Sequence, residues 1–339
     1  MRALVVGKRI AVSLNEEIMN FRSRGEIVRV VVFGCLFIAA IVLPMSPGFG
    51  LLLGIGFSIM VGNPFPERSS VWAQRILGWS VVGLGAGIQI GVILKLGMQS
   101  AGLTILSVGL TLAIGIWIGR ISSLSKEISV LLAAGTAICG ASAIAALGAV
   151  MKPKREDLSA AMAAIFLLNA VALFIFPAIG QFLQFDQQQF GLWAALAIHD
   201  TSSVVGAGME YGEEALEVAT TVKLIRVLWI LPLTIGVSLA FQKEDAAKER
   251  KLPIPFFVFG FLGVATFFTL FPGLSVVASG VKTGAYSLLT GAIFLVGTCL
   301  SKSALREIGF RPLLVSFGLW VIVAVVSAVA LKFGWIGLG

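Results

Sequence analysis

Charged residues are scarce in this 339-residue chain. Asp, Glu, Lys and Arg together make up 12% of the sequence, and there is a single His. A soluble domain carries about 25% charged residues. This composition, with a mean hydropathy of +1.00, therefore excludes an ordinary soluble enzyme. Three Cys are too few for a disulfide framework. No His or Cys cluster has the spacing of metal ligands, so no metal site is expected.

The chain has a series of apolar runs instead, and 58% of its residues are hydrophobic. A helix needs about 20 mostly apolar residues to cross the hydrocarbon core. Nine stretches qualify: 27–43, 47–62, 71–94, 102–119, 158–183, 214–241, 254–271, 283–300 and 312–335. The sequence therefore predicts an all-α polytopic membrane protein with about 9–11 transmembrane helices. A polar cytoplasmic leader, 1–26, precedes a single transmembrane transporter domain, 27–339.

Two more apolar stretches, 127–151 and 190–212, are interrupted by small and polar residues. Each is expected either to cross the membrane as a discontinuous helix or to dip in and return as a re-entrant hairpin. Irregular backbone at membrane depth is tolerated only where it is buried in protein or lines a cavity. Gly-interrupted segments in two halves of a chain point to a transporter binding site. We therefore expect both stretches at a central site.

Basic residues predict the orientation. The net charge is +8, and the basic residues lie between apolar runs. This arrangement is typical of membrane topology and not of a nucleic-acid-binding face. The basic leader predicts a cytoplasmic N-terminus. The basic loop 152–155 obeys the same rule only if 127–151 re-enters. Charge counting thus favours re-entry, and the crossing alternative stays open. The far side receives an acidic cluster: Glu210, Glu213 and Glu214.

A weak internal repeat relates the two ends of the chain. Residues 84–97 align without gaps to 296–309, with a Gly matched near each end. The same offset pairs two further apolar runs: 47–62 with 259–274, and 102–119 with 314–331. Paired spans run in opposite directions across the membrane, so the pattern predicts inverted repeats.

Several motifs make the sequence recognisable. They are Gly-Thr-Ala-Ile-Cys-Gly-Ala-Ser-Ala at 135–143, Ile-His-Asp-Thr-Ser-Ser-Val-Val-Gly-Ala-Gly at 198–208, Lys-Leu-Ile-Arg-Val at 223–227, and Leu-Gly-Ile-Gly with Val-Gly-Asn-Pro near 53–64. From about residue 28 onward the chain resembles the YeiH-type family of bacterial inner-membrane proteins, which are usually labelled sulfate exporters. That family is grouped with the cation–proton antiporter and bile-acid symporter superfamily. The resemblance implies about ten helices in inverted repeats, discontinuous helices at a central site, and an elevator-like motion in the bacterial inner membrane.

His199 and Asp200 are the candidate coupling-ion residues. An Asp at membrane depth costs about 2.5 kcal/mol or more, so it is a functional candidate. We interpret the pair as a protonatable site that couples proton movement to transport. The alternative is structural, because Asp200 and the three hydroxyl residues after it are good N-cap residues for a half-helix.

Small and polar residues in the two interrupted stretches are the candidate substrate ligands. They are Thr136, Cys139, Gly140 and Ser142 in the first stretch, and Thr201, Ser202 and Ser203 in the second. A half-helix N-terminus offers free N–H groups and partial positive charge to an anion. Glycine lets the backbone approach the ligand closely. The alternative interpretation is close helix packing by small residues.

Lys223 and Arg226 complete the candidate site. They lie three residues apart on one face of the span 214–241. Two cations at membrane depth need a counter-charge or an anion. We interpret them as ligands of the substrate anion, and pairing with Asp200 is the alternative. Three amide side chains are lesser candidates, with interhelical hydrogen bonds as the ordinary explanation: Asn63, Gln89 and Asn169.

These features predict an ion-coupled secondary transporter that exports a small inorganic or sulfur-containing anion of the sulfate or sulfite type. The first alternative is a proton- or sodium-coupled importer or exchanger of a small organic anion. An intramembrane enzyme is the second alternative, and no catalytic motif supports it. No Walker-type loop and no cofactor are expected. The expected partners are the anion, a coupling H⁺ or Na⁺ and the lipid bilayer. Nucleic acid is not among them, and a homodimer stays open.

Overall fold

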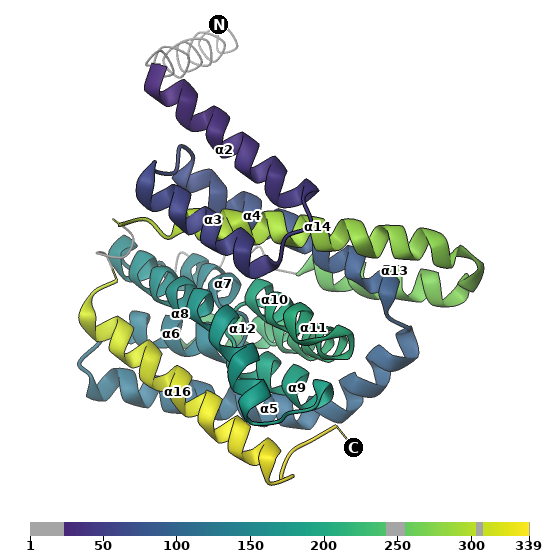
Figure 1. Ribbon diagram of the computed structural model, residues 1–339. Coiled ribbons are helices and arrows are strands. Elements are labelled where there is room, and N and C mark those ends of the chain that lie inside the picture. The colour runs from purple at the N-terminus through teal and green to yellow at the C-terminus, as the bar shows by residue number, and fades with distance from the viewer. Residues whose placement is uncertain (1–23, 242–254, 303–307, 339) are drawn as a thin grey trace, which may run out of the picture.

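The computed structural model describes residues 24–241, 255–302 and 308–338. This part of the chain is helical and contains no strand, which confirms an all-α membrane protein. Figure 1 shows the helices in two layers, which we call the flank layer and the hairpin bundle. Most of the predicted leader, 1–26, lies outside the described residues, and so does the loop 242–254.

The flank layer is built around one long helix, α14, which packs against α2, α3 and α4. Its five helices are α2 (Arg24–Val42), α3 (Pro47–Met60), α4 (Pro66–Leu84), α13 (Phe256–Leu270) and α14 (Ser275–Cys299). Local signals set where two of them start. Ser46 caps α3, accepting a 3.3 Å hydrogen bond from the Phe49 N–H, and Pro47 and Pro66 occupy the first turns of α3 and α4.

The remaining helices form the hairpin bundle. They are α5 (Ile90–Ile121), α6 (Lys126–Ala137), α7 (Ala141–Met151), α8 (Arg155–Phe182), α9 (Gln187–Ala197), α10 (Thr201–Tyr211), α11 (Glu213–Leu228), α12 (Ile230–Ala240) and α16 (Phe310–Lys332). Among the described residues, five helical segments are long and apolar enough to cross a membrane: Ile90–Ile121, Arg155–Phe182, Glu213–Ala240, Pro272–Cys299 and Phe310–Lys332.

Each of the nine expected spans contains a helix, but the span 71–94 is wrong at its end. The helix α4 stops at Leu84, a short 3-10 turn follows at Gly85–Gly87, and α5 starts at Ile90. The apolar run continues through this turn, so hydropathy alone merges two helices. Glycine destabilises helix interiors by about 1 kcal/mol relative to Ala, which favours a break at the Gly-Ala-Gly segment.

The predicted repeat corresponds to a close helix crossing that occurs twice. A Cβ added to Gly85, at the end of α4, would lie 2.5 Å from the Phe261 carbonyl oxygen of α13. A Cβ added to Gly297, its partner in the repeat, would lie 2.5 Å from the Leu51 carbonyl oxygen of α3. Only glycine permits either approach without a backbone shift. The repeat thus relates α3 to α13 and α4 to α14, with matching glycines at matching crossings.

The stretch 127–151 forms a re-entrant hairpin, α6–α7. Its start lies at the start of α8, because the Ser125 hydroxyl donates a 3.2 Å hydrogen bond to Asp157. Its end lies there too, since a Cβ on Gly148 would be 2.8 Å from Leu158. The tip lies further along α8, with Gly140 against Ile165. Both ends of the hairpin therefore lie at one end of α8, which rules out a full crossing.

The stretch 190–212 forms a second hairpin, α9–α10, which enters from the opposite end of α8. Its start packs near the end of α8, because a Cβ added to Gly180 would lie 2.5 Å from the Phe190 ring. Further along, the Phe176 and Trp193 rings stack with centroids 4.3 Å apart. The Gln187 side chain accepts a 3.0 Å hydrogen bond from the Glu214 N–H at the start of α11, next to the end of α10. The two tips meet halfway, with Gly140 against Asp200.

The two hairpin bases carry opposite charge. Five basic residues gather at the base of α6–α7, which we call the basic end: Arg120, Lys126, Lys152, Lys154 and Arg155. They outnumber the three acidic residues there, Glu127, Glu156 and Asp157. Acidic residues gather at the base of α9–α10, which we call the acidic end: Asp186, Glu210, Glu213 and Glu214. The positive-inside rule predicts a cytoplasmic basic end. The cytoplasmic N-terminus itself stays a prediction.

Candidate functional site

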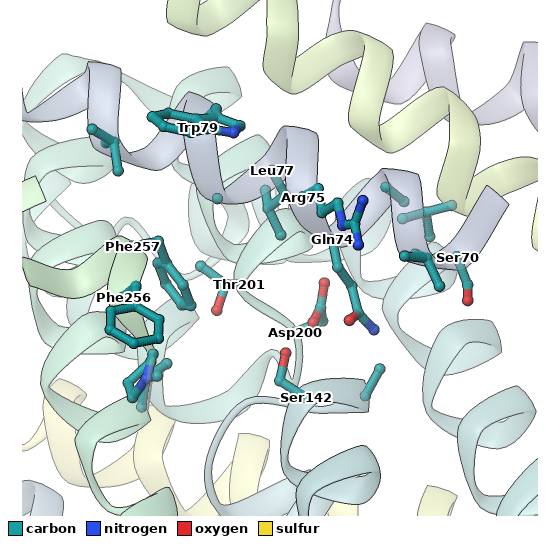
Figure 2. Close-up of a pocket in the computed structure, with 18 of the residues that line it drawn as sticks. Ser70, Gln74, Arg75, Leu77, Trp79, Ser142, Asp200, Thr201, Phe256 and Phe257 are labelled. Carbon is teal, nitrogen blue, oxygen red and sulfur yellow. The ribbon is translucent and has the colours of Figure 1, made fainter. Parts of the chain in front are cut away.

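A cavity of about 600 Å³ lies between the flank layer and the two hairpin tips. Figure 2 shows side chains from both layers in its walls. The hairpin bundle contributes Ala141 and Ser142 from the first tip, Asp200 and Thr201 from the second, and Val227 and Ile230 from α11 and α12. The flank layer contributes residues of α4, α13 and α14: Ser70, Gln74, Arg75, Trp79, Phe256, Phe257 and Cys299, among others.

The cavity extends from the tips toward the basic end. Lys282 lies near the start of α14 and pairs with Glu213 at the acidic end, so the C-terminal end of α14 lies toward the basic end. The start of α4 also lies toward the basic end, because the Asn63 amide, just before α4, donates a 3.1 Å hydrogen bond to the Thr298 carbonyl near the end of α14. Ser70, Cys299 and Phe256 in the wall therefore mark the side of the cavity that faces the basic end.

Two half-helices begin at the cavity wall. Ala141 and Ser142 are the first residues of α7, and Thr201 is the first residue of α10. The first four N–H groups of a helix have no partner within the helix, and the N-terminus carries about half a positive charge. Two such ends at one cavity make it suitable for an anion.

Gly140 makes this arrangement possible at the first tip. Its φ of +60° lies in the region that favours glycine, and a Cβ there would lie 3.2 Å from the Asp200 Cβ. No side chain caps α7. The N-cap residue Gly140 has no side chain to bond the start of α7, although the Ala143 N–H is bonded by the Cys139 side chain.

Asp200 caps the second half-helix. Its carboxylate accepts a 3.1 Å hydrogen bond from the Ser202 N–H and another from the Ser202 hydroxyl, and its own N–H donates to Asn169 Oδ1 at 3.1 Å. The structural alternative for Asp200 is thus present, and Asn169 makes the interhelical bond expected of it. Asp200 also lines the cavity, so the cap and a coupling role are compatible.

His199 does not share the Asp200 environment. The backbone at Ile198 and Asp200 is extended, and successive side chains on extended backbone point to opposite sides. The His199 ring is buried, with its centroid 6.3 Å from that of Trp320 in α16. Neither ring nitrogen has a hydrogen-bond partner within the described residues. The expected coupling pair is therefore divided, with Asp200 alone at the cavity.

Lys223 and Arg226 lie behind the tips, fully buried and outside the cavity wall. Lys223 Nζ donates a 2.7 Å hydrogen bond to the Ile198 carbonyl. The Arg226 guanidinium donates to the Ala195 and Leu196 carbonyls, both at 2.6 Å, and to the Ala137 carbonyl. Within the described part of the chain neither cation forms a salt bridge with Asp200. In this conformation Lys223 binds the C-terminal end of α9, and Arg226 binds the C-terminal ends of both α6 and α9.

Of the other predicted ligands, some line the cavity and some are buried away from it. Ser142 and Thr201 reach the cavity. Thr136, Cys139, Ser202 and Ser203 are buried around the tips, where small residues pack closely, as the alternative interpretation expected. The lesser candidate Asn63 bonds across helices to Thr298, while Gln89 stands before α5 without a side-chain cap bond.

Arg75 and Gln74 line the cavity, and the sequence did not single them out as candidate ligands. Arg75 lies in α4, about 13 Å along the helix from Pro66. Its guanidinium has no hydrogen-bond or ion-pair partner among the residues that the structure describes. The sequence did hold a signal, because Arg75 falls inside the expected span 71–94, where a cation needs a partner.

The fold defines a polytopic all-α membrane protein with two re-entrant hairpins at a central cavity. Residues 48–316 match the family model described as Conserved hypothetical protein 698. The chain belongs to this family, whose members include proteins called UPF0324 membrane proteins.

Similar proteins come from several bacteria. A UPF0324 membrane protein of Bdellovibrio bacteriovorus is 43% identical over 297 residues, which cover 86% of this chain and 90% of that protein. Another, from Porphyromonas gingivalis, is 44% identical over 290 residues, covering 84% and 86%. A third, from Vibrio vulnificus, is 39% identical over 296 residues, covering 86% and 95%. No solved structure matches the chain.

Proposed function

We propose that this protein is an ion-coupled secondary transporter of a small anion. The observation that carries the proposal is the convergence of two half-helix N-termini and the unpaired Arg75 guanidinium on one cavity at the hairpin tips. Arginine can hold two oxygens of an oxyanion at once, and a helix N-terminus can donate further N–H groups. The Ser202 N–H of α10 is already bonded to Asp200, so the start of α7 is the better donor. A cavity of about 600 Å³ has room for an inorganic oxyanion with water or for a small sulfonate.

The resemblance to YeiH-type proteins supports sulfate or sulfite as the substrate class and export as the direction. The cavity is also directed toward the basic end, which the positive-inside rule assigns to the cytoplasm. Loading from the cytoplasm is what export requires. Import or exchange of a small organic anion is the second candidate, because the apolar wall around Phe256, Phe257 and Trp79 suits an organic tail.

Asp200 is the proposed coupling residue. Its carboxylate faces the same cavity as the anion, and two negative charges in one low-dielectric space repel each other. Protonation of Asp200 removes that repulsion, so proton binding and anion binding favour each other. The proposed transporter needs no catalytic group and no cofactor.

Counterflow of a labelled anion in proteoliposomes tests the proposal. The substrates to compare are sulfate, sulfite, a taurine-like sulfonate and a dicarboxylate. One class should exchange across the membrane, and Arg75→Gln should reduce that exchange at least tenfold. Arg120→Gln, which removes an exposed cation at the basic end, should leave it unchanged. No counterflow with any member of the panel, or an Arg75→Gln protein with normal exchange, would contradict this function.

A further inference from the structure

The C-terminal ends of the two half-helices α6 and α9 meet at the hairpin tips, deep inside the protein. The last carbonyl groups of any helix lack a partner within the helix, and that end carries about half a negative charge. At membrane depth such carbonyls must be satisfied by protein groups, water or an ion. Here donors from α11 supply the bonds: Ala137, Ala195, Leu196 and Ile198 all accept hydrogen bonds from Lys223 or Arg226.

The two cations divide this task. The Arg226 fork joins the hairpins, since it donates to Ala137 of the first and to Ala195 and Leu196 of the second. The Lys223 ammonium serves the second hairpin alone, at 2.7 Å from the Ile198 oxygen and 3.5 Å from the Ala195 oxygen. Both side chains have zero exposed surface. Their desolvation is offset by the carbonyl dipoles that they contact.

Carbonyls of this kind have another use in secondary transporters. Where helices are interrupted at the membrane midplane, unwound carbonyls and half-helix C-termini coordinate the coupling Na⁺. A bound sodium ion and a lysine ammonium each place one positive charge against the same oxygens. In this protein the charge is covalently attached to α11 and cannot leave with the substrate.

We propose that Lys223 and Arg226 occupy the place of a coupling sodium ion, and that neither the tip structure nor transport requires sodium. The inference rests on the proposed function for its statement about transport. It leaves Asp200 as the group at the cavity that can bind and release a coupling proton. Lys223 and Arg226 are positioning residues in this scheme, because they hold the tips and do not touch the cavity.

The first measurement uses the unmodified, full-length protein in detergent, with chloride as the only small anion present. Thermal unfolding is compared in sodium, potassium and choline chloride at equal ionic strength. We expect the same midpoint in all three salts. A sodium-specific rise of about 2 °C or more would show a sodium site that the tethered cations do not replace and would overturn the inference.

The second measurement removes one tethered charge. Lys223→Ala exposes the Ile198 and Ala195 carbonyls, so the variant should unfold at a lower temperature and regain part of the loss in sodium but not in choline. Lys282→Ala is the matched control, since Lys282 pairs with a carboxylate at the acidic end and not with helix carbonyls. If Lys223 is purely structural, the unfolding temperature should fall equally in every salt. That result would overturn the proposal that Lys223 takes the place of a sodium ion. If Lys223→Ala does not fold, Lys223→Gln provides the same comparison.

Transport separates the two proposals. Counterflow with choline in place of sodium on both sides should proceed at the rate seen in sodium, and a loss of at least tenfold would overturn sodium independence. If no anion on the panel exchanges in either salt, the proposed function fails. The unfolding experiments still decide whether the tips bind sodium, because they require no transport.

Discussion

Lys282 of α14 pairs with Glu213, the first residue of α11, and so joins the flank layer to the hairpin bundle at the acidic end. Beside this pair the layers close tightly: Thr220 is fully buried, and the space left between Leu84, Glu217 and Tyr286 is only about 10 Å³. The large cavity lies on the other side of the tips. The structure therefore represents a state that is closed at the acidic end.

Reversing one charge of this pair should favour opening at the acidic end. An exposed ion pair contributes about 0.2–1 kcal/mol, so Glu213→Lys should raise the open population about 1.5- to 5-fold. Labelling of a Cys placed at Thr220, in a background lacking Cys35, Cys139 and Cys299, measures the opening. The double variant with Lys282→Glu should restore slow labelling, and Glu210→Lys should leave the rate unchanged. Equal labelling rates in all variants would mean that the Lys282–Glu213 pair does not keep the acidic end closed.

The re-entrant path of α6–α7 predicts which loops share a side of the membrane. Ser123 and Pro153 flank the hairpin, so a Cys at either position should react with an impermeant thiol reagent from the same side. Gln188, at the base of the other hairpin, should react only from the opposite side. A full crossing of 127–151 predicts that Ser123 and Pro153 react from opposite sides. With a cytoplasmic basic end, the shared side is the cytoplasm.

Asp200→Asn should remove the pH dependence of anion binding. In the unmodified protein, anion affinity should rise as pH falls, because protonation removes a negative charge from the cavity wall. The Asn variant should bind with one affinity at every pH and keep its fold, since Asn caps a helix nearly as well as Asp. Asp186→Asn is the control, as Asp186 caps α9 at the acidic end. If anion affinity keeps its pH dependence in Asp200→Asn, the cap is the whole role of Asp200.

Arg226→Lys should weaken both the fold and anion binding. A lysine keeps the charge but cannot reach the carbonyls of both hairpins at once. Loss of a charge-assisted hydrogen bond costs about 1.5–3 kcal/mol, which corresponds to roughly 10- to 150-fold if it appears in affinity. Lys223→Ala should cause a smaller loss of affinity, because Lys223 contacts one hairpin only.

The Asp200 counter-ion alternative makes a different prediction for these variants. It requires that Asp200→Asn rescue the stability of an Arg226 or Lys223 neutralisation. No salt bridge joins Asp200 to either cation, and helix carbonyls contact both cations directly. The longer-range attraction between Lys223 and Asp200 should therefore leave the double variants little more stable than the single ones. Thermal unfolding with and without sulfate measures both effects.

The sequence by itself determined the elements and the position of the site along the chain. Within the described residues an apolar run located each membrane helix, although hydropathy merged the end of α4 with the start of α5. The Gly, Ser and Thr residues that interrupt 127–151 and 190–212 located the two tips. These features are local, because hydrophobicity and helix interruption depend on neighbouring residues. The matched Gly85 and Gly297 were visible too, since a repeat is a property of the chain itself.

Only the tertiary structure decided how the tips are completed. A re-entrant hairpin and a broken crossing helix have the same hydropathy, so their paths differ only through contacts with α8. Arg226 bonds a carbonyl 89 positions away, and Arg75 reaches the site from the other layer. His199 and Asp200 are adjacent in sequence and separate in space, because extended backbone turns their side chains to opposite sides. These partners are set by contacts between segments that are distant in the sequence, and a local sequence pattern does not specify such contacts.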